Sequence, residues 1–366
     1  MPSPPTPPVA SAEHAAFRAL ERFSCLDGLR CLSILAVIWH HASIDVAGLP
    51  GSQRGFLGVD LFFVISGFLI VTLLLRERER RGSISLRQFY ARRTLRIFPA
   101  YYATLLGLAC LYALAGEGSE RAALYFAELP SYLTYTSNWF DVAIFGISWS
   151  LATEEQFYLF WPPIERFARR WVWPALIALI AVSQFANFAR DGAVFEMVFG
   201  ADARALDIMQ VTFTPIALGV ALAHALHDPR SFAWLFRVAG GRFAAPAWLA
   251  AVFAIANIPA ADISGAQRLA LHLAMTMLVA STTLRDGNAL RSLLTLPWIA
   301  RIGVVSYGMY LFHLFAMAAI QRAAPGLPGA LLFGATVAAT WLVAEASFRW
   351  FEAPFLRMKE RLGSRG

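Results

Sequence analysis

The sequence predicts an all-α polytopic membrane protein with about ten transmembrane helices and both termini in the cytoplasm. Of the 366 residues, 58% are hydrophobic and 15% are charged, whereas soluble domains have roughly 45–50% and about 25%. Apolar segments of roughly 17–20 residues recur along the chain, long enough to cross a hydrocarbon core of about 30 Å. The formal net charge of +7 comes from basic residues clustered between these segments, which indicates contact with membrane lipids and not with nucleic acid.

The basic clusters predict the orientation of each apolar segment in the membrane. The arginines from Arg76 to Arg96 and those from Arg166 to Arg170 are expected in the cytoplasm, so only one crossing fits between the third span and Arg166. The segment 123–140 contains Pro130, and we expect it to be re-entrant or interfacial. The expected spans are 26–44, 56–75, 97–115, 147–165, 171–189, 206–226, 243–259, 266–284, 302–321 and 329–350.

We expect three parts along the chain. Residues 1–22 are rich in proline and lack the features of a signal peptide, which predicts a disordered cytoplasmic tail. Residues 23–356 form the membrane domain, and residues 357–366 form a basic cytoplasmic tail. The three cysteines, Cys25, Cys31 and Cys110, form no CxxC pair and are expected to be reduced, packed thiols.

The first span contains several ionisable residues, which are costly in a membrane and therefore candidates for function. Arg30 and His41 are eleven residues apart, so they differ by about 20° around a helix and by roughly 16 Å along it. Asp27 lies about 60° from Arg30 and about 40° from His41 around the helix, whereas His40 points about 80° away from Arg30. These residues form either two ends of a polar channel or an Asp27–Arg30 interfacial anchor with a packing histidine. Histidine suits acyl transfer because it exchanges a proton near neutral pH and can itself be acylated.

A second group of candidates follows span two in the stretch FYARRTLRIFPAYY. Arg93 and Arg96 are three residues apart and share a helix face. Guanidinium groups bind phosphates in a bidentate manner, so this pair could bind a phosphorylated ligand. The alternative is an ordinary cytoplasmic basic cluster. Asp60, in GVDLFFVISGF, is a weaker sign of an aqueous cavity.

Carboxylates supply further candidates. Glu154 and Glu155 lie in SWSLATEEQFYLFWPP and point about 100° apart, so only one can face a given cavity; Glu154 is taken as the catalytic candidate. Glu352 is seven residues after Glu345 and shares its face, and it could instead pair with an arginine. His313 is interpreted as a packing residue.

The chain has no nucleotide-binding loop, no HExxH and no zinc-type Cys/His spacing. We therefore expect no metal. The remaining His, Arg, Glu and Ser residues suffice for acid/base group transfer.

From about Leu26 to Phe355 the chain resembles the acyltransferase-3 family, which includes bacterial O-antigen and polysaccharide O-acetyltransferases. The matching stretches are LDGLRCLSILAVIWHHA, GVDLFFVISGFLI, FYARRTLRIFPAYY, SWSLATEEQFYLFWP, ISYGMYLFHL and FRWFEAPF. The resemblance implies a multi-pass enzyme of the bacterial inner membrane. It also implies an acyl-CoA donor, often acetyl-CoA, and an acceptor hydroxyl on a carbohydrate or lipid-linked glycan.

The resemblance also implies roles for individual residues. Arg30 and His41 match the family's Arg-x10-His motif, which makes His41 the catalytic base or acyl carrier and Arg30 a structural or donor-binding partner. Arg93 and Arg96 match its donor-associated Arg-x-x-Arg motif. Glu352 matches a carboxylate near the end of the family's domain.

Two alternatives to this function remain at the level of sequence. One is a transporter that exports a lipid or small metabolite, because intramembrane Arg, His and Glu are equally expected there. The other is a succinyltransferase acting on glycans. Many relatives append an extracytoplasmic domain that completes the transfer, so we expect that this membrane domain acts alone or with a separate extracytoplasmic transferase.

Overall fold

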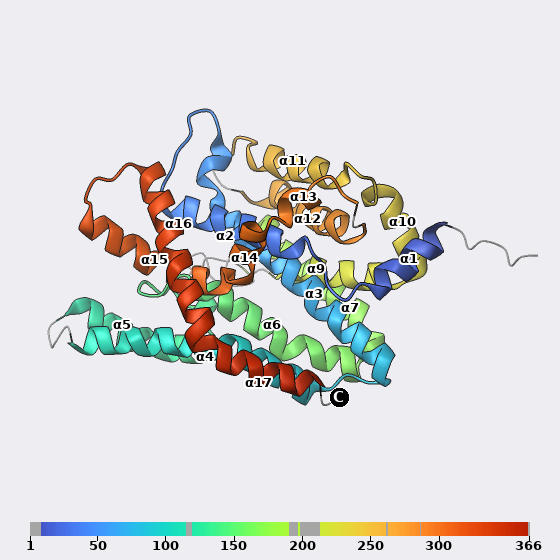
Figure 1. Ribbon diagram of the computed structural model, residues 1–366, viewed down its shortest axis with the longest axis horizontal. Helices are drawn as coiled ribbons and strands as arrows, with labels where there is room; N and C mark the ends of the chain where they lie inside the picture. Colours follow the sequence, from blue (N-terminus) through green and yellow to red (C-terminus); the bar gives the residue numbers. More distant parts are fainter. Residues whose placement is uncertain are drawn as a thin grey trace, which may run out of the picture. The chain divides into compact units, whose positions relative to one another are not determined.

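The computed structural model describes residues 9–114, 119–189, 197, 213–260, 263–285 and 287–364. Throughout these residues every regular element is a helix, and none is a strand (Figure 1). The all-α expectation is therefore confirmed for the part of the chain that the structure describes.

The chain forms two compact units, each built from two separate stretches. Unit 1 comprises residues 1–76 and 214–306, and unit 2 comprises residues 77–213 and 307–366. The boundary at 76/77 falls inside helix α3 (Gly58–Arg81).

Unit 1 is organised around α2, α3 and α12. Helix α2 packs against α14, and α12 packs against α9 and α11. The apolar face of α2 is fully buried at Leu29, Ile34 and Ile38. Besides the first part of α3, the elements are α1 (Val9–Ala19), α2 (Leu26–His41), η1 (Pro50–Gln53), η2 (Gly55–Leu57), α9 (Thr214–His227), α10 (Pro229–Ala239), α11 (Ala244–Ala256), α12 (Gly265–Thr283), α13 (Arg291–Leu294) and α14 (Pro297–Val304).

Unit 2 is built on α4, which packs against α5, α6 and α17. Buried tyrosines join α4 to α5: the Tyr101 hydroxyl donates to the Tyr132 carbonyl at 2.9 Å, and the Tyr125 hydroxyl donates to the Leu105 carbonyl at 2.6 Å. The elements are α4 (Leu86–Leu114), α5 (Glu120–Leu133), η3 (Ser137–Trp139), α6 (Ser148–Phe167), η4 (Arg169–Trp171), α7 (Val172–Ala189), α15 (Ser306–Ala323), α16 (Gly329–Ala346), η7 (Ser347–Glu352) and α17 (Ala353–Ser364).

Element η7 is a π-helical turn between α16 and α17. A π-turn changes the number of residues per turn, and such turns are frequent at functional sites. The expectation that Glu345 and Glu352 share a face assumed regular α-helical spacing, which does not hold across Ser347–Glu352.

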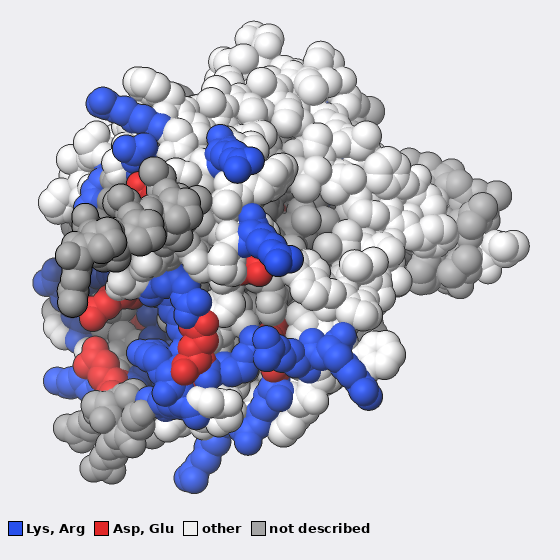
Figure 2. Space-filling view, turned by 90° about the vertical axis from the view of Figure 1, so that its right-hand side faces the viewer, with Lys and Arg blue, Asp and Glu red and all other residues white. Residues whose placement is uncertain are grey.

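Among the described residues, four segments are long and apolar enough to cross a membrane: Gly55–Arg81, Leu86–Leu114, Arg169–Ala189 and Gly329–Glu360. Two bent helix pairs, Pro229–Ala239 with Ala244–Ala256 and Pro297–Val304 with Ser306–Ala323, raise the number to six if each pair is one span. The chain is thus a multi-pass membrane protein. On the face shown in Figure 2, the Lys, Arg, Asp and Glu side chains gather together, and broad uncharged surface lies beside them.

The count of ten spans and the cytoplasmic position of both termini stay predictions. The expected span 26–44 forms α2, whose 16 residues extend about 24 Å, less than the hydrocarbon core. The expected spans 147–165 and 266–284 form α6 and α12, whose polar residues lower their hydropathy. The expected span 206–226 lies partly outside the described residues. Helix α5, in the segment 123–140, is not among the candidate spans, and its interfacial position stays a prediction.

Two local expectations were wrong. Within the expected disordered tail 1–22, residues Val9–Ala19 form helix α1, which packs on α10 and buries Phe17; residues 1–8 lie outside the described residues. The three thiols are free, but Cys110 is exposed on α4, whereas Cys25 and Cys31 are buried. A helix that faces lipid can expose a cysteine, because a thiol is a small apolar group.

Candidate active site

Arg30 and His41 lie on one unbroken helix, α2, as the sequence predicted. The guanidinium of Arg30 donates to the Asp27 carboxylate at 3.0 Å, and Arg22 donates to its other oxygen at 2.6 Å. Asp27 is buried, so this cluster neutralises a carboxylate at the start of the helix. Asp27 and Arg30 therefore pair, and the interfacial position of this pair stays a prediction.

The two adjacent histidines at the end of α2 differ in their surroundings. The Nδ1 atom of His40 lies 2.8 Å from the Gln53 carbonyl oxygen, and its ring packs edge-on against Phe56 at 5.4 Å between centroids. His40 therefore ties α2 to the η1–η2 segment. His41 is the last residue of α2, and its ring lies 5.2 Å from that of His40.

In unit 2, Arg93 of α4 contacts three side chains of α6. Its guanidinium donates to Glu154 at 3.1 Å, its Nε atom lies 3.6 Å from Glu155, and its charge lies 3.8 Å from the centre of the Tyr158 ring. The Tyr158 hydroxyl also donates to Glu154. Charge-assisted hydrogen bonds and cation–π contacts thus hold the arginine in one orientation.

A pocket of about 180 Å³ opens beside Arg93. Glu155 lines it together with Arg93 and Tyr158, whereas Glu154 does not. The expectation that only one of the two carboxylates faces a given cavity agrees with this arrangement, and the catalytic role of Glu154 stays a prediction. The Oε1 atom of Glu155 and the Nε atom of Arg93 make no hydrogen bond within the described residues.

Arg96 lies in a group of positive charges formed by two helices. Helix α17 packs along α4, and the half-buried Lys359 of α17 lies within electrostatic range of Arg92, Arg93 and Arg96. Arg96 also interacts electrostatically with Glu352, which accepts a hydrogen bond from the Ser347 hydroxyl at 3.0 Å. The predicted pairing of Glu352 with an arginine stays a prediction. We call Arg92, Arg93, Arg96 and Lys359 the basic cluster.

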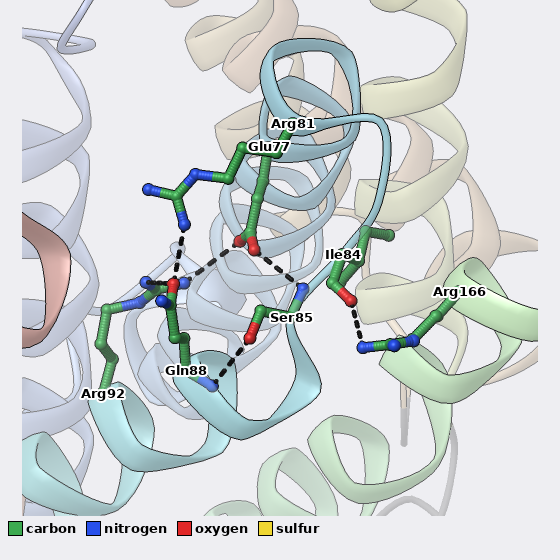
Figure 3. A network of polar contacts seen from close by, with 7 residues as sticks. All are labelled: Glu77, Arg81, Ile84, Ser85, Gln88, Arg92 and Arg166. Atoms are coloured by element: carbon green, nitrogen blue, oxygen red, sulfur yellow. Dashed lines mark hydrogen bonds and ion pairs between the residues drawn. The ribbon is translucent and has the colours of Figure 1, made fainter. Parts of the chain in front are cut away.

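A polar network around the α3–α4 turn sets the start of α4 and hence the direction of these arginines (Figure 3). The buried Glu77 accepts from Arg92 at 3.2 Å and from the backbone N–H of Ser85 at 2.8 Å. Gln88 accepts from Arg81 at 2.8 Å and from Arg92 at 3.3 Å. From the end of α6, Arg166 donates to the Ile84 carbonyl at 2.5 Å, which joins α6 to the same turn.

The structure brings some predicted site residues together and assigns others to separate units. Arg30 and His41 belong to unit 1. Arg93, Arg96 and the two carboxylates Glu154 and Glu352 belong to unit 2. His313, interpreted as a packing residue, is fully buried in α15 with Nδ1 2.7 Å from the Tyr310 carbonyl.

Sequence reasoning missed several polar residues. Arg268 and His272 lie four residues apart inside the apolar segment 266–284, and that signal could have identified them. The contributions of Tyr158 and Lys359 carried no such signal, because each depends on packing against α4. Within the described residues no group of three metal-binding side chains occurs, and the absence of a metal stays an expectation.

Residues 23–345 match the acyltransferase domain family. The chain belongs to this family. The family predicted from the sequence is confirmed, as is the expectation of an acyltransferase.

Three relatives illustrate the similarity within the family. The chain is 29% identical to a peptidoglycan O-acetyltransferase, OatA, of Listeria monocytogenes, over 90% of this chain and 55% of the relative. It is 28% identical to a putative O-acetyltransferase of Staphylococcus aureus (90% and 56%) and 26% identical to a putative peptidoglycan O-acetyltransferase, YrhL, of Bacillus subtilis (90% and 54%). The chain therefore spans about half the length of these relatives. No solved structure matches it.

Proposed function

We propose that this protein is a membrane O-acetyltransferase of the bacterial cytoplasmic membrane. It transfers an acetyl group from acetyl-CoA to a hydroxyl of a cell-envelope glycan. The family match carries this proposal, and the relatives named for O-acetyl transfer support the acetyl group and the glycan acceptor. The match favours an enzyme over the exporter considered from the sequence.

The basic cluster supports a coenzyme A donor. Lys359 lies within range of three arginines of like charge. Arg92 and Arg93 also contact Glu77 and Glu154, and the density of positive charge along α4 and α17 attracts anions. The phosphates of coenzyme A are such anions, and arginine binds them through two parallel hydrogen bonds. In this proposal Arg96 makes the main phosphate contact, while Arg93 is oriented by Glu154, Glu155 and Tyr158.

His41 is the proposed catalytic residue. Its imidazole takes the proton of the acceptor hydroxyl while the oxygen attacks the thioester carbonyl. The carbon–sulfur bond then breaks, and the coenzyme A thiolate leaves and receives the proton. In the alternative sequence, the imidazole is acylated first and then transfers the acetyl group to the hydroxyl.

An apolar pocket of about 470 Å³ in unit 1 supports a lipid-linked acceptor. It lies between α2, the start of α3, α11 and α12, and its lining includes Trp39, Leu249 and Met275. This volume is typical of ligand sites. The half-buried Arg54 lies at the pocket and donates to the uncharged backbone carbonyls of Ala256, Ile258 and Ala260, so an aliphatic tail with an anionic head group would suit it.

The test compares His41→Ala with the matched neighbour variant His40→Ala in a bacterial strain that lacks the native copy. Mass spectrometry of envelope glycans and lipids identifies both the acyl group and the acceptor, and succinylation would appear as a different added mass. We expect His41→Ala to abolish acylation and His40→Ala to retain part of it. Full acylation by His41→Ala would refute the proposed mechanism.

A second measurement uses the purified protein with radiolabelled acetyl-CoA. Transfer of label to glycan supports an acetyltransferase. Label on His41 itself indicates the mechanism in which the imidazole is acetylated first. Binding of an acceptor without turnover of acetyl-CoA would refute an acetyl-CoA-dependent transferase.

A further inference from the structure

Unit 1 contains three ionisable side chains that are almost completely buried. Asp60 of α3 is 3% exposed, and Arg268 and His272 of α12 are 4% and 1% exposed. The Asp60 carboxylate accepts from Arg268 at 3.1 and 3.3 Å, and its Oδ2 atom lies 3.1 Å from His272 Nε2. These residues, 208 and 212 positions apart in the chain, form one polar cluster, which we call the Asp60 cluster.

Stability alone does not account for the Asp60 cluster. Its Arg268 Nε and His272 Nδ1 atoms are buried and have no hydrogen-bond partner among the described residues. Each such buried group costs about 1–3 kcal/mol, and replacing buried ions with apolar side chains is often neutral or stabilising. Ionisable residues kept at such a position in a membrane protein indicate a functional role.

Residues 55–58, directly before Asp60, lie against the second half of α2. A Cβ atom at Gly58 would lie 2.3 Å from the Ser33 carbonyl oxygen, and one at Gly55 would lie 2.1 Å from that of Ala36. Only glycine permits this approach of the two backbones. A Cβ atom at Gly55 would also lie 3.0 Å from His40 Cβ, so the position of residues 55–58 determines where the second half of α2 lies.

Side chains make a second connection from the cluster to α2. The Arg268 guanidinium lies 6.0 Å from the centre of the Phe56 ring, and Phe56 packs edge-on against His40. His40 in turn packs against His41 at 5.2 Å. A continuous series of contacts thus leads from the buried Asp60 cluster to the end of α2.

We propose that Asp60, Arg268 and His272 are positioning residues for His41. The inference rests on the proposed function of His41. The ion pair fixes the start of α3 against α12, and residues 55–58 transmit that position to the last turn of α2. A misplacement of about 1 Å in a catalytic group can lower the rate about 100-fold, so a small shift of this turn suffices to impair transfer.

The test measures kcat, the KM for acetyl-CoA and thermal stability for the purified full-length protein. Asp60→Asn keeps the shape of the side chain and removes its charge. We expect kcat to fall about 10–100-fold, with a KM for acetyl-CoA within twofold of the parent value, because donor binding does not involve these residues. The matched control is Glu165→Gln in unit 2, which removes a buried carboxylate that lies 3.5 Å from Arg78.

A triple variant, Asp60→Leu, Arg268→Met and His272→Leu, separates positioning from folding. Apolar replacement should restore thermal stability, whereas kcat stays low because the directional contacts to Phe56 and Asp60 are gone. Parent-like kcat in the triple variant, or an equal fall of kcat in Glu165→Gln, would overturn the inference.

The activity of His41→Ala shows whether the positioning role or the proposed function has failed. If His41→Ala is inactive while Asp60→Asn keeps the parent kcat, the positioning role is refuted and the proposed function stands. If His41→Ala is fully active, both are refuted.

Discussion

Replacing Arg93 with alanine should destabilise unit 2, because the guanidinium joins α4 to α6. The variant loses a hydrogen bond to Glu154 at 3.1 Å, a charge contact with Glu155 at 3.6 Å and the stacking on Tyr158 at 3.8 Å. It also leaves two adjacent carboxylates without their counter-charge.

The magnitude follows from these contacts. A hydrogen bond to a charged group contributes about 1.5–3 kcal/mol and a cation–π contact about 0.5–2 kcal/mol. The side chains of Arg93 and Glu154 are 18% and 17% exposed, so solvent screening is modest and the total is about 2–4 kcal/mol. In a double-mutant cycle, the interaction free energy between Arg93→Ala and Glu154→Gln should be roughly 0.5–3 kcal/mol.

The assay is equilibrium unfolding of the purified protein in mixed detergent. Arg87→Ala on the same helix is the matched control, since Arg87 is exposed and its loss should change stability by less than about 0.5 kcal/mol. If Arg93→Ala is no less stable than Arg87→Ala, the reasoning about the α4–α6 contacts is refuted.

Three further predictions follow from the same contacts. Arg96→Ala should raise the KM for acetyl-CoA about tenfold, equivalent to about 1.4 kcal/mol, with kcat little changed; an unchanged KM in steady-state assays would contradict a phosphate contact. Glu154→Gln should lower the free energy of unfolding by about 1–3 kcal/mol and Glu155→Gln by less, because Glu155 Oε1 makes no hydrogen bond within the described residues; the reverse order in detergent unfolding would contradict this. Asp228 caps α10, and the backbone N–H of Ser231 lowers the pKa of its carboxyl. Asp228→Ala should therefore cost about 1 kcal/mol near pH 7, and the difference should vanish as the pH falls below the unfolded pKa of about 3.9 and through the lower folded value; a pH-independent difference would count against the cap.

The sequence by itself determined the class of protein, the family and the helices that carry the site residues. Composition and apolar length depend on local residues, so an all-α membrane protein could be predicted without knowing any contact. Helical phase is equally local, and it correctly assigned Arg30 and His41 to one helix and Arg93 and Arg96 to another. The family stretches are contiguous and could be identified in the same way.

Only the tertiary structure decided which side chains meet. The contact between Arg93 and Glu154 joins residues 61 positions apart, and that between Asp60 and Arg268 joins residues 208 apart. Such pairs depend on which helix faces pack together, and local periodicity does not contain that information. For the same reason only the tertiary structure shows that Glu155 lines the pocket beside Arg93. The sequence also predicted a regular helix where the chain forms a π-turn before Glu352.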